Sequence, residues 1–268
     1  LGSRGLGDVY KRQYHKKDVL LDEVSRQFIE DYEFWLKTEK KCCHNTATKY
    51  LKNFKKIIRI ALAKGWMKND PFLEIRFSLD KVEPDFLEDS EIQKLISKEI
   101  DIPRLSQVRD IFVFCCFTGL AFSDIHGLRK EHIVEDSNGV RWIRKGRQKT
   151  KIMCNIPLME IPLKILEKYS TNEYCKKHGV LFPVLCNQKM NAYLKELADI
   201  CGIKKTLTTH VGRHTFATFA LANGVSIESV AKMLGHTNVQ MTRHYARVLD
   251  RTVIREMSQI KMDFHISI

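Results

Sequence analysis

Apolar residues recur at helical spacing through the first third of this chain, and this periodicity restricts it to folds that begin with packed helices. One stripe runs from about Leu20 to Trp35, and a second follows Asn45-Thr46 and runs from Tyr50 to Ala61. Residues three and four apart share one face of a helix, so the stripes predict two amphipathic helices. The two stripes consist of Leu20, Val24, Phe28, Tyr32 and Trp35, and of Tyr50, Phe54, Ile57, Ile58 and Ala61.

A polar segment that contains a proline interrupts the helical pattern. Gly65 ends the second predicted helix, and residues 81–85, Lys-Val-Glu-Pro-Asp, have no apolar period. A chain of 268 residues usually forms about two domains. We therefore predict a helical domain over residues 14–80, a linker over 81–88 and a second domain over 89–268.

The first thirteen residues stand apart from the predicted domains. They mix Gly, Arg and Lys without periodicity, and the chain starts with Leu1 rather than Met. We expect residues 1–13 to be unstructured or artefactual, such as a translated vector end. In that case a natural N-terminal extension is missing.

The second predicted domain begins with helices and then changes its period. A long apolar helix stops at Gly119, and residues 134–140 are typical of a strand, a turn and a strand, because the Asn-Gly pair tolerates the positive φ of a tight hairpin. A third strand is predicted from Ile152 to Pro157, and helical patterns follow it. The predicted fold class is mainly α with a small antiparallel β-sheet.

The charge balance favours a polyanionic partner. The chain has 45 Lys and Arg against 32 Asp and Glu, a net charge of +13. Neutralised phosphates release counterions, so such an excess favours DNA or RNA. Lys49, Lys52 and Lys56 share the basic face of the second helix, which is either a solvated surface or a DNA contact. The residue type of Arg243 also fits a contact with the DNA backbone.

Several classes of protein are excluded or disfavoured by composition. No run of roughly 18 apolar residues is present, so no membrane span is predicted, and the N-terminus lacks a secretory pattern. The eight cysteines include the pairs Cys42-Cys43 and Cys115-Cys116 but no C-x-x-C spacing for zinc. We expect reduced thiols that mostly fill the core, a cytoplasmic location, and no metal or cofactor.

Three features near the C-terminal end stand in a fixed order. They are the box over residues 208–217, the tripeptide Leu-Gly-His that ends at His236, and Tyr245. A threonine at the start of the box can cap a helix on which His210 and Arg213 share a face. The glycine before His236 can end a helix, so the turn that follows can bring His236 near Tyr245.

These residue types suit the transfer of a phosphoryl group. Arginine binds phosphate oxygens in a bidentate manner, histidine donates to the same oxygens or moves a proton, and tyrosine supplies an oxygen nucleophile. Arginine and lysine can neutralise the charge that grows on the phosphorane, a task that metal ions perform elsewhere. The chemistry therefore requires no metal.

The chain resembles the tyrosine recombinase family, also called the phage integrase family. Besides the C-terminal motifs, the resemblance includes Phe117-Thr118-Gly119-Leu120 and Arg147-Gln148-Lys149-Thr150, and it covers about residues 89–261. It implies a helical, SAM-like core-binding domain and a mixed α/β catalytic domain. It also implies a site-specific DNA recombinase or integrase, encoded by a bacterium, a phage or another mobile element. Such enzymes act on double-stranded DNA in synaptic complexes, here expected to be tetramers.

The resemblance also implies a role for each residue of the motifs. Tyr245 forms a 3′-phosphotyrosyl bond with DNA, and His210, Arg213 and His236 contact the scissile phosphate. Lys149, in the β-hairpin, protonates the leaving 5′-oxygen. The covalent bond keeps the energy of the cut phosphodiester, so rejoining needs no ATP.

One position departs from the family pattern. Thr118-Gly119-Leu120 is normally followed by the first catalytic arginine, and here that position is Ala121. We predict that Arg147 substitutes, because it is two residues from Lys149 and would face the same way on a strand. Asp124 matches the family's acidic residue, which we expect to orient a neighbouring group of the site.

Other interpretations of the same residues stay open at this stage. Ser226 to Arg247 can form a helix-turn-helix of a regulator that binds DNA without cutting it. A type IB topoisomerase would use the same phosphotyrosine chemistry for relaxation. Lys149 can be solvated hairpin charge, and His210 with Arg213 can be a capping or salt-bridging pair. The remaining basic residues near the motifs are interpreted as surface or DNA-backbone residues, namely His214, Arg243, His244 and Arg247.

Overall fold

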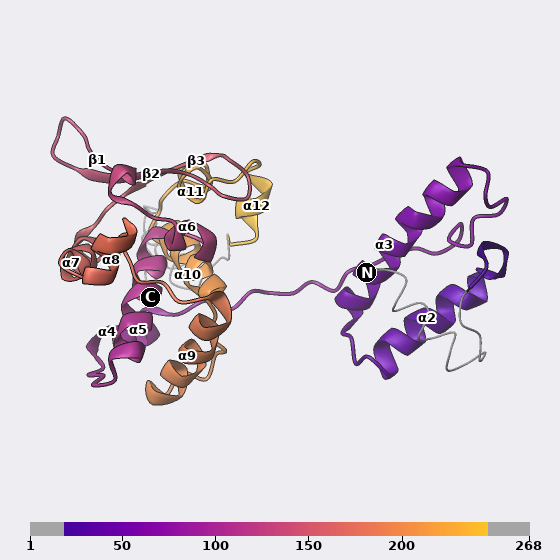
Figure 1. Ribbon diagram of the computed structural model, residues 1–268, viewed down its shortest axis with the longest axis horizontal. Coiled ribbons are helices and arrows are strands. Elements are labelled where there is room, and N and C mark those ends of the chain that lie inside the picture. The colour runs from indigo at the N-terminus through magenta and orange to yellow at the C-terminus, as the bar shows by residue number, and fades with distance from the viewer. Residues whose placement is uncertain (1–18, 246–268) are drawn as a thin grey trace, which may run out of the picture. The chain divides into compact units, whose positions relative to one another are not determined.

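The computed structural model describes residues 19–245, and the chain divides between Val82 and Glu83 into two compact units (Figure 1). Each unit has its own hydrophobic core. Residues 75–88 form neither helix nor strand. The described chain is mainly helical and has one three-stranded antiparallel sheet, which confirms the predicted fold class.

The first unit is built on helices α2, Arg26–Thr38, and α3, His44–Ala63. Phe28 of α2 meets Phe54 of α3 edge to face, with ring centroids 6.3 Å apart, and Phe72 packs on Phe54 from the segment that follows α3. These apolar contacts form the centre of the unit. The predicted helical stripes therefore mark the core of the first unit, except at three positions where the side chain is exposed.

Three residues of the predicted stripes are exposed rather than buried. Leu20 is 70% exposed, because residues 21–23 form a short 3-10 turn, η1, and the side chain of Ser25 starts α2 by accepting a hydrogen bond from the backbone N–H of Phe28. Tyr50 and Ile57 are 50% and 49% exposed, since they lie at the edge of the buried face of α3.

The second unit places its sheet across one side of a set of helices, as Figure 1 shows. The second half of helix α5, from Ile111 to Thr118, is almost entirely apolar and buried, and α7, α9 and α10 pack against the helix. The close approach of α5 and α10 depends on Gly212, where an added Cβ would lie 3.2 Å from Cys115 Cβ. In chain order the elements are α4 Asp89–Ser97, α5 Pro103–Thr118, α6 Phe122–His126, η2 Lys130–His132, β1 Ile133–Glu135, β2 Arg141–Gly146, β3 Met153–Pro157, α7 Glu160–Tyr169, α8 Glu173–His178, α9 Asn187–Ile200, α10 Thr209–Ala222, α11 Ile227–Leu234 and α12 Gln240–Arg243.

The sheet has the order β1-β2-β3 and is antiparallel throughout, with Val134 opposite Trp142 and Ile143 opposite Ile156. Gly139 makes the first hairpin possible, because it adopts a φ of +74°. Strand β2 ends at Gly146, so residues 147–152 form the turn that leads into β3. This turn carries the Arg-Gln-Lys-Thr motif.

The structure also bears on the cysteines, on metal binding and on membrane spans. All eight cysteines are free thiols, and Cys115, Cys116, Cys154 and Cys175 are buried, whereas Cys43 and Cys186 are exposed. Within residues 19–245 no group of three or more potential ligands is arranged to hold a metal ion. In the same range no helix is both long enough and apolar enough to cross a membrane.

We predict that Gly119→Ala destabilises the second unit by about 2–4 kcal/mol. Gly119 ends α5 with a φ of +67°, and an added Cβ would clash with Phe216 and lie 2.8 Å from Leu234 Cδ2. Gly139→Ala is the matched control, because Gly139 has a similar φ of +74° but no atom within 4 Å of an added Cβ. Urea denaturation measures both variants, and equal losses in the two would contradict the packing argument.

Candidate active site around Arg213

Arg213 lies at the point where helices α5, α10 and α11 meet. Its side chain projects from α10, is only 2% exposed, and donates to two carbonyls that end the other helices: Nη1 to Gly119 at 2.6 Å and Nη2 to Leu234 at 2.7 Å. The glycine of the Phe-Thr-Gly-Leu motif is therefore an acceptor for the arginine of the C-terminal box. Each motif supplies part of one hydrogen-bond network.

The charge of Arg213 has no salt bridge to a carboxylate within residues 19–245. Burial, followed by the charge of Arg147, lowers its pKa from the ordinary value. The charge of Asp124 acts in the opposite direction, but a buried cation that has no salt bridge is still costly, so the site favours an anion. A phosphate group would supply the missing negative charge and can accept from a guanidinium in a bidentate manner.

His236 follows the left-handed Gly235 that ends α11 and contacts Arg213 directly. Its Nε2 lies 3.0 Å from Arg213 Nη2, and its Nδ1 lies 2.8 Å from the hydroxyl oxygen of Thr242. An arginine only donates, so Nε2 must be the unprotonated acceptor and Nδ1 carries the proton. Burial and the charges of Arg213 and Arg147 lower the pKa of His236 to about 4.

Tyr245 lies just after α12, beside the histidine. It is 9% exposed and packs with Phe216 and Leu234. Its ring is nearly parallel to that of His236, with centroids 6.1 Å apart, and the charge of its phenolate form would raise the pKa of Arg213. The turn after α11 thus brings His236 and Tyr245 together, as the spacing of the motifs suggested.

His210 and His214 lie one turn apart on α10, and their rings meet edge to face with centroids 4.4 Å apart. His210 keeps an exposed edge, but the packing around its ring and the nearby charges of Arg213, Arg147 and Lys149 lower its pKa. No side chain of the box caps α10. Instead, Asn191 accepts from the backbone N–H of Thr209.

His214, interpreted from the sequence as a surface or DNA-backbone residue, lies beside Tyr245. Its ring is half-buried and lies 5.1 Å, between centroids, from the ring of Tyr245. The sequence did hold a signal for this position. His214 is four residues after His210, so both histidines face the same side of one helix.

The turn between β2 and β3 is fixed by contacts at both ends. Asp124, 2% exposed on α6, accepts from the backbone N–H of Gln148 at 2.9 Å, and its other oxygen lies 3.5 Å from Arg147 Nε. The Thr150 hydroxyl donates to the carbonyl of Gly235 at 3.4 Å. These contacts tie the turn to α6, whose N-cap is Ala121, and to the Leu-Gly-His tripeptide.

The stated reason for the prediction about Arg147 is wrong, because Arg147 and Lys149 lie in a turn rather than on a strand. The turn nevertheless brings both toward the cluster, since both charges lower the pKa of His210 and that of Arg147 also lowers those of Arg213 and His236. Lys149 is exposed, whereas the Arg147 side chain is 11% exposed.

The side chain of Arg147 crosses directly over Gly235. An added Cβ at Gly235 would lie 2.7 Å from Arg147 Cδ and 2.9 Å from Arg147 Cγ. The absence of a side chain at this glycine therefore gives the arginine its path into the cluster. Sequence spacing could not reveal this contact, because the two residues belong to different motifs.

The other predicted DNA contacts lie outside this cluster. Lys49 and Lys56 are exposed on α3, and the ammonium group of Lys52 lies over the ring of Phe77, 5.8 Å from its centroid. Arg243 is exposed on α12. Arg247 falls outside the described residues.

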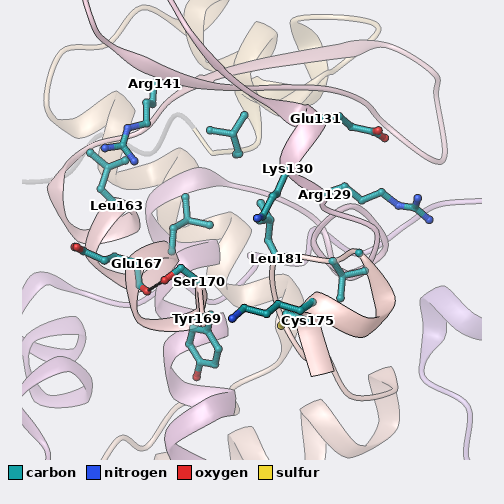
Figure 2. A pocket seen from close by; sticks show the side chains of 15 residues that line it. Arg129, Lys130, Glu131, Arg141, Leu163, Glu167, Tyr169, Ser170, Cys175 and Leu181 are labelled. Atoms are coloured by element: carbon teal, nitrogen blue, oxygen red, sulfur yellow. Dashed lines mark hydrogen bonds between the residues drawn. The ribbon is translucent and has the colours of Figure 1, made fainter. Parts of the chain in front are cut away.

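A cavity of about 740 Å³ lies elsewhere in the second unit (Figure 2). Residues of η2, β2, α7 and α8 line it, and they include the cations Lys130 and Lys176 and the apolar side chains of Leu163 and Leu181. None of the predicted catalytic residues lines this cavity. The candidate catalytic cluster therefore does not lie in this pocket.

Two family models match successive parts of the chain. The phage integrase family model matches residues 85–252, and the phage integrase SAM-like domain model matches residues 9–79. The chain belongs to the phage integrase family. It is a tyrosine-type, site-specific DNA recombinase.

Curated relatives carry the same description. A tyrosine recombinase of Pseudothermotoga lettingae is 30% identical over 244 residues, which cover 88% of this chain and 82% of the relative. The tyrosine recombinase XerD of Oceanobacillus iheyensis is 28% identical over 270 residues and covers 91% and 89% of the two chains. This recombinase thus matches most of the length of both relatives.

Solved structures share the fold at low sequence identity. A lambda integrase fragment, residues 75–356, solved as a dimer on a core site, has a TM-score of 0.71 at 16% identity and covers 98% of this chain and 91% of that one. XerH recombinase in a post-cleavage complex has a TM-score of 0.70 at 14% identity, with coverage of 94% and 76%. These similarities establish the recombinase fold.

We predict that the second unit loses stability as the pH falls from about 6.5 toward 4. The pKa of His236 is about 4 in the folded chain against 6.5 ordinarily, so in this interval the unfolded chain binds a proton that the folded chain does not. His210, whose pKa is also lowered, adds to the effect. Urea denaturation at about pH 7 and about pH 5 measures the loss.

The replacement His236→Gln removes one of these groups and should make the free energy of unfolding depend less on pH. His126→Gln, at an exposed position of the same unit, is the control and should leave the dependence unchanged. An identical pH dependence in the wild type and His236→Gln would show that His236 does not titrate in this way.

Proposed function

We propose that this recombinase cuts double-stranded DNA with the phenol oxygen of Tyr245 while Arg213 holds the scissile phosphate. The observation that carries this proposal is the buried guanidinium of Arg213, which has no salt bridge to a carboxylate in the described chain and lies 3.0 Å from His236. Tyr245 packs beside that histidine. An anion site and an oxygen nucleophile are thus adjacent, as phosphoryl transfer requires.

In the proposed reaction the oxygen of Tyr245 attacks phosphorus, a 3′-phosphotyrosyl bond forms, and the bond to the 5′-oxygen breaks. Lys149 gives a proton to the leaving 5′-oxygen, and His210, neutral at pH 7 because its pKa is lowered, accepts the phenol proton. Arg213 stays with the phosphate oxygens, and His236 stays hydrogen-bonded to Arg213. Attack by a 5′-hydroxyl reverses the steps and rejoins the strand, so no cofactor or ATP is consumed.

Arg147 replaces the family arginine that is absent at Ala121. Asp124, on the helix that Ala121 caps, pairs with Arg147 Nε, and the side chain passes over Gly235 toward His236 and Arg213. The charge of Arg147 lowers the pKa values of both. It is therefore close enough to share the neutralisation of a bound phosphate.

The first unit acts as the core-binding domain in this proposal, with residues 14–80 as the domain, 81–88 as the linker and 89–268 as the catalytic domain. The match of the SAM-like family model to residues 9–79 supports it. Lys49, Lys52, Lys56 and Arg243 bind the DNA backbone in this proposal, since all four are exposed cations.

The assembly that recombines two sites is a tetramer on DNA, formed in the cytoplasm of a bacterium from a chromosomal, phage or transposon gene. Structures similar in fold, of lambda integrase and XerH, were solved on DNA sites, and the lambda integrase was solved as a dimer. The similar Tn1549 integrase belongs to a transposon. These similarities support both the DNA partner and an origin in a bacterium or a mobile element.

We predict that Tyr245→Phe abolishes the covalent adduct and leaves DNA binding nearly unchanged, because it deletes the attacking oxygen and keeps the packed ring. The substrate is a nicked suicide duplex carrying a candidate recombination site, and a denaturing gel detects the adduct. Tyr174→Phe, at an exposed tyrosine of the same unit, is the control and should form adduct normally. A covalent adduct formed by Tyr245→Phe would remove Tyr245 from the role of nucleophile.

We predict that Arg147→Ala slows adduct formation by about 10²–10³, the usual effect of removing one preorganised donor. Adding Ala121→Arg to that variant should restore much of the rate, since an arginine then returns to the family position. Arg144→Ala, at an exposed position of β2, is the matched control and should cleave like the wild type. Wild-type cleavage by Arg147→Ala would refute the substitution.

A further inference from the structure

Thr242 connects the two central residues of the site. It lies on α12, is fully buried at 0% exposure, and its hydroxyl oxygen is 2.8 Å from His236 Nδ1. Its backbone carbonyl accepts from the N–H of Tyr245 at 2.9 Å. The side chain of Thr242 thus contacts His236, and its backbone carbonyl contacts Tyr245.

The contacts of His236 leave only one satisfactory arrangement of its proton. Arg213 donates to Nε2, so a proton on Nε2 would place two donors against each other. A proton on Nδ1 finds the hydroxyl oxygen of Thr242 as its acceptor. Without that oxygen the Nδ1–H would lose its partner in a largely buried position.

The same hydrogen bond is compatible with both protonation states of the ring. Nδ1 carries a proton in this neutral tautomer and also in the imidazolium, so Thr242 can accept from it in either state. The hydrogen bond to Thr242 therefore keeps the ring in its orientation and leaves Nε2 to accept from Arg213 beside a bound phosphate. A hydrogen-bond partner of this kind fixes a histidine for its task.

We propose that Thr242 is a positioning residue of the recombination reaction: its hydroxyl holds His236 in the Nδ1–H tautomer, and its carbonyl sets the turn that places Tyr245 beside that ring. The catalytic half of this inference rests on the proposed function. The tautomer half rests only on the contacts of Arg213, His236 and Thr242.

The experiment compares Thr242→Val, which keeps the shape and removes the hydroxyl, with Thr242→Ser, which keeps the hydroxyl. Thr218→Val is the control for the same change at another buried threonine of the unit. The first measurement is the ¹⁵N NMR signature of the His236 ring nitrogens. Wild type, Thr242→Ser and Thr218→Val should show the Nδ1–H tautomer, and Thr242→Val should show a mixture.

The second measurement is the rate of adduct formation against pH on the suicide duplex. Thr242→Val should be slower by about 10- to 100-fold with an altered pH profile, the size typical of losing a partner that orients a histidine. Thr242→Ser should recover most of the rate. DNA binding by both variants should stay near that of the wild type.

The two measurements separate the two hypotheses. If Thr242→Val keeps the wild-type tautomer, or if Thr242→Ser loses it, the positioning role is overturned. If the tautomers change as expected but the wild type forms no adduct on a candidate site, the proposed function fails while the control of His236 by Thr242 stands. If Thr242→Val and the wild type form adduct at equal rates, Thr242 does not contribute to catalysis.

Discussion

The guanidinium of Arg213 is buried between the ends of two helices, and the geometry of the whole site follows from it. Removing a cation from water costs several kcal/mol, and hydrogen bonds to a charged group return about 1.5–3 kcal/mol each. The carbonyls of Gly119 and Leu234 supply two such bonds. The helix ends must stay in place to keep them, so the positions of His236 and Tyr245 depend on the same network.

Much of this arrangement could be predicted from the sequence, because it depends on local periodicity or on motifs read in order. Helices α2 and α3, the hairpin at Gly139 and the closeness of His236 to Tyr245 are of this kind. The path of Arg147 could not be predicted in the same way. It depends on where β2 ends and on a contact with Gly235, which is distant in sequence.

At a few positions the burial of a side chain differs from what the sequence pattern suggested, and each difference has a physical cause. Tyr50 and Ile57 match the helical period but lie at the edge of the buried face, where periodicity alone does not decide exposure. His214 was interpreted as a surface or DNA-backbone residue because nothing in the sequence fixes the direction of its side chain. Its burial follows from the neighbours of α10, which no local pattern describes.

The support of Arg213 by the carbonyl of Leu234 also has a consequence for synthesis on the ribosome. The chain is made from its N-terminus, so the arginine and the lysine-bearing turn emerge before the acceptor that completes the arginine's surroundings. A polypeptide released before residue 234 would carry the basic groups without their final arrangement and without the proposed nucleophile. The proposed DNA-cutting site can thus assemble only after residues 234–245 have been synthesised.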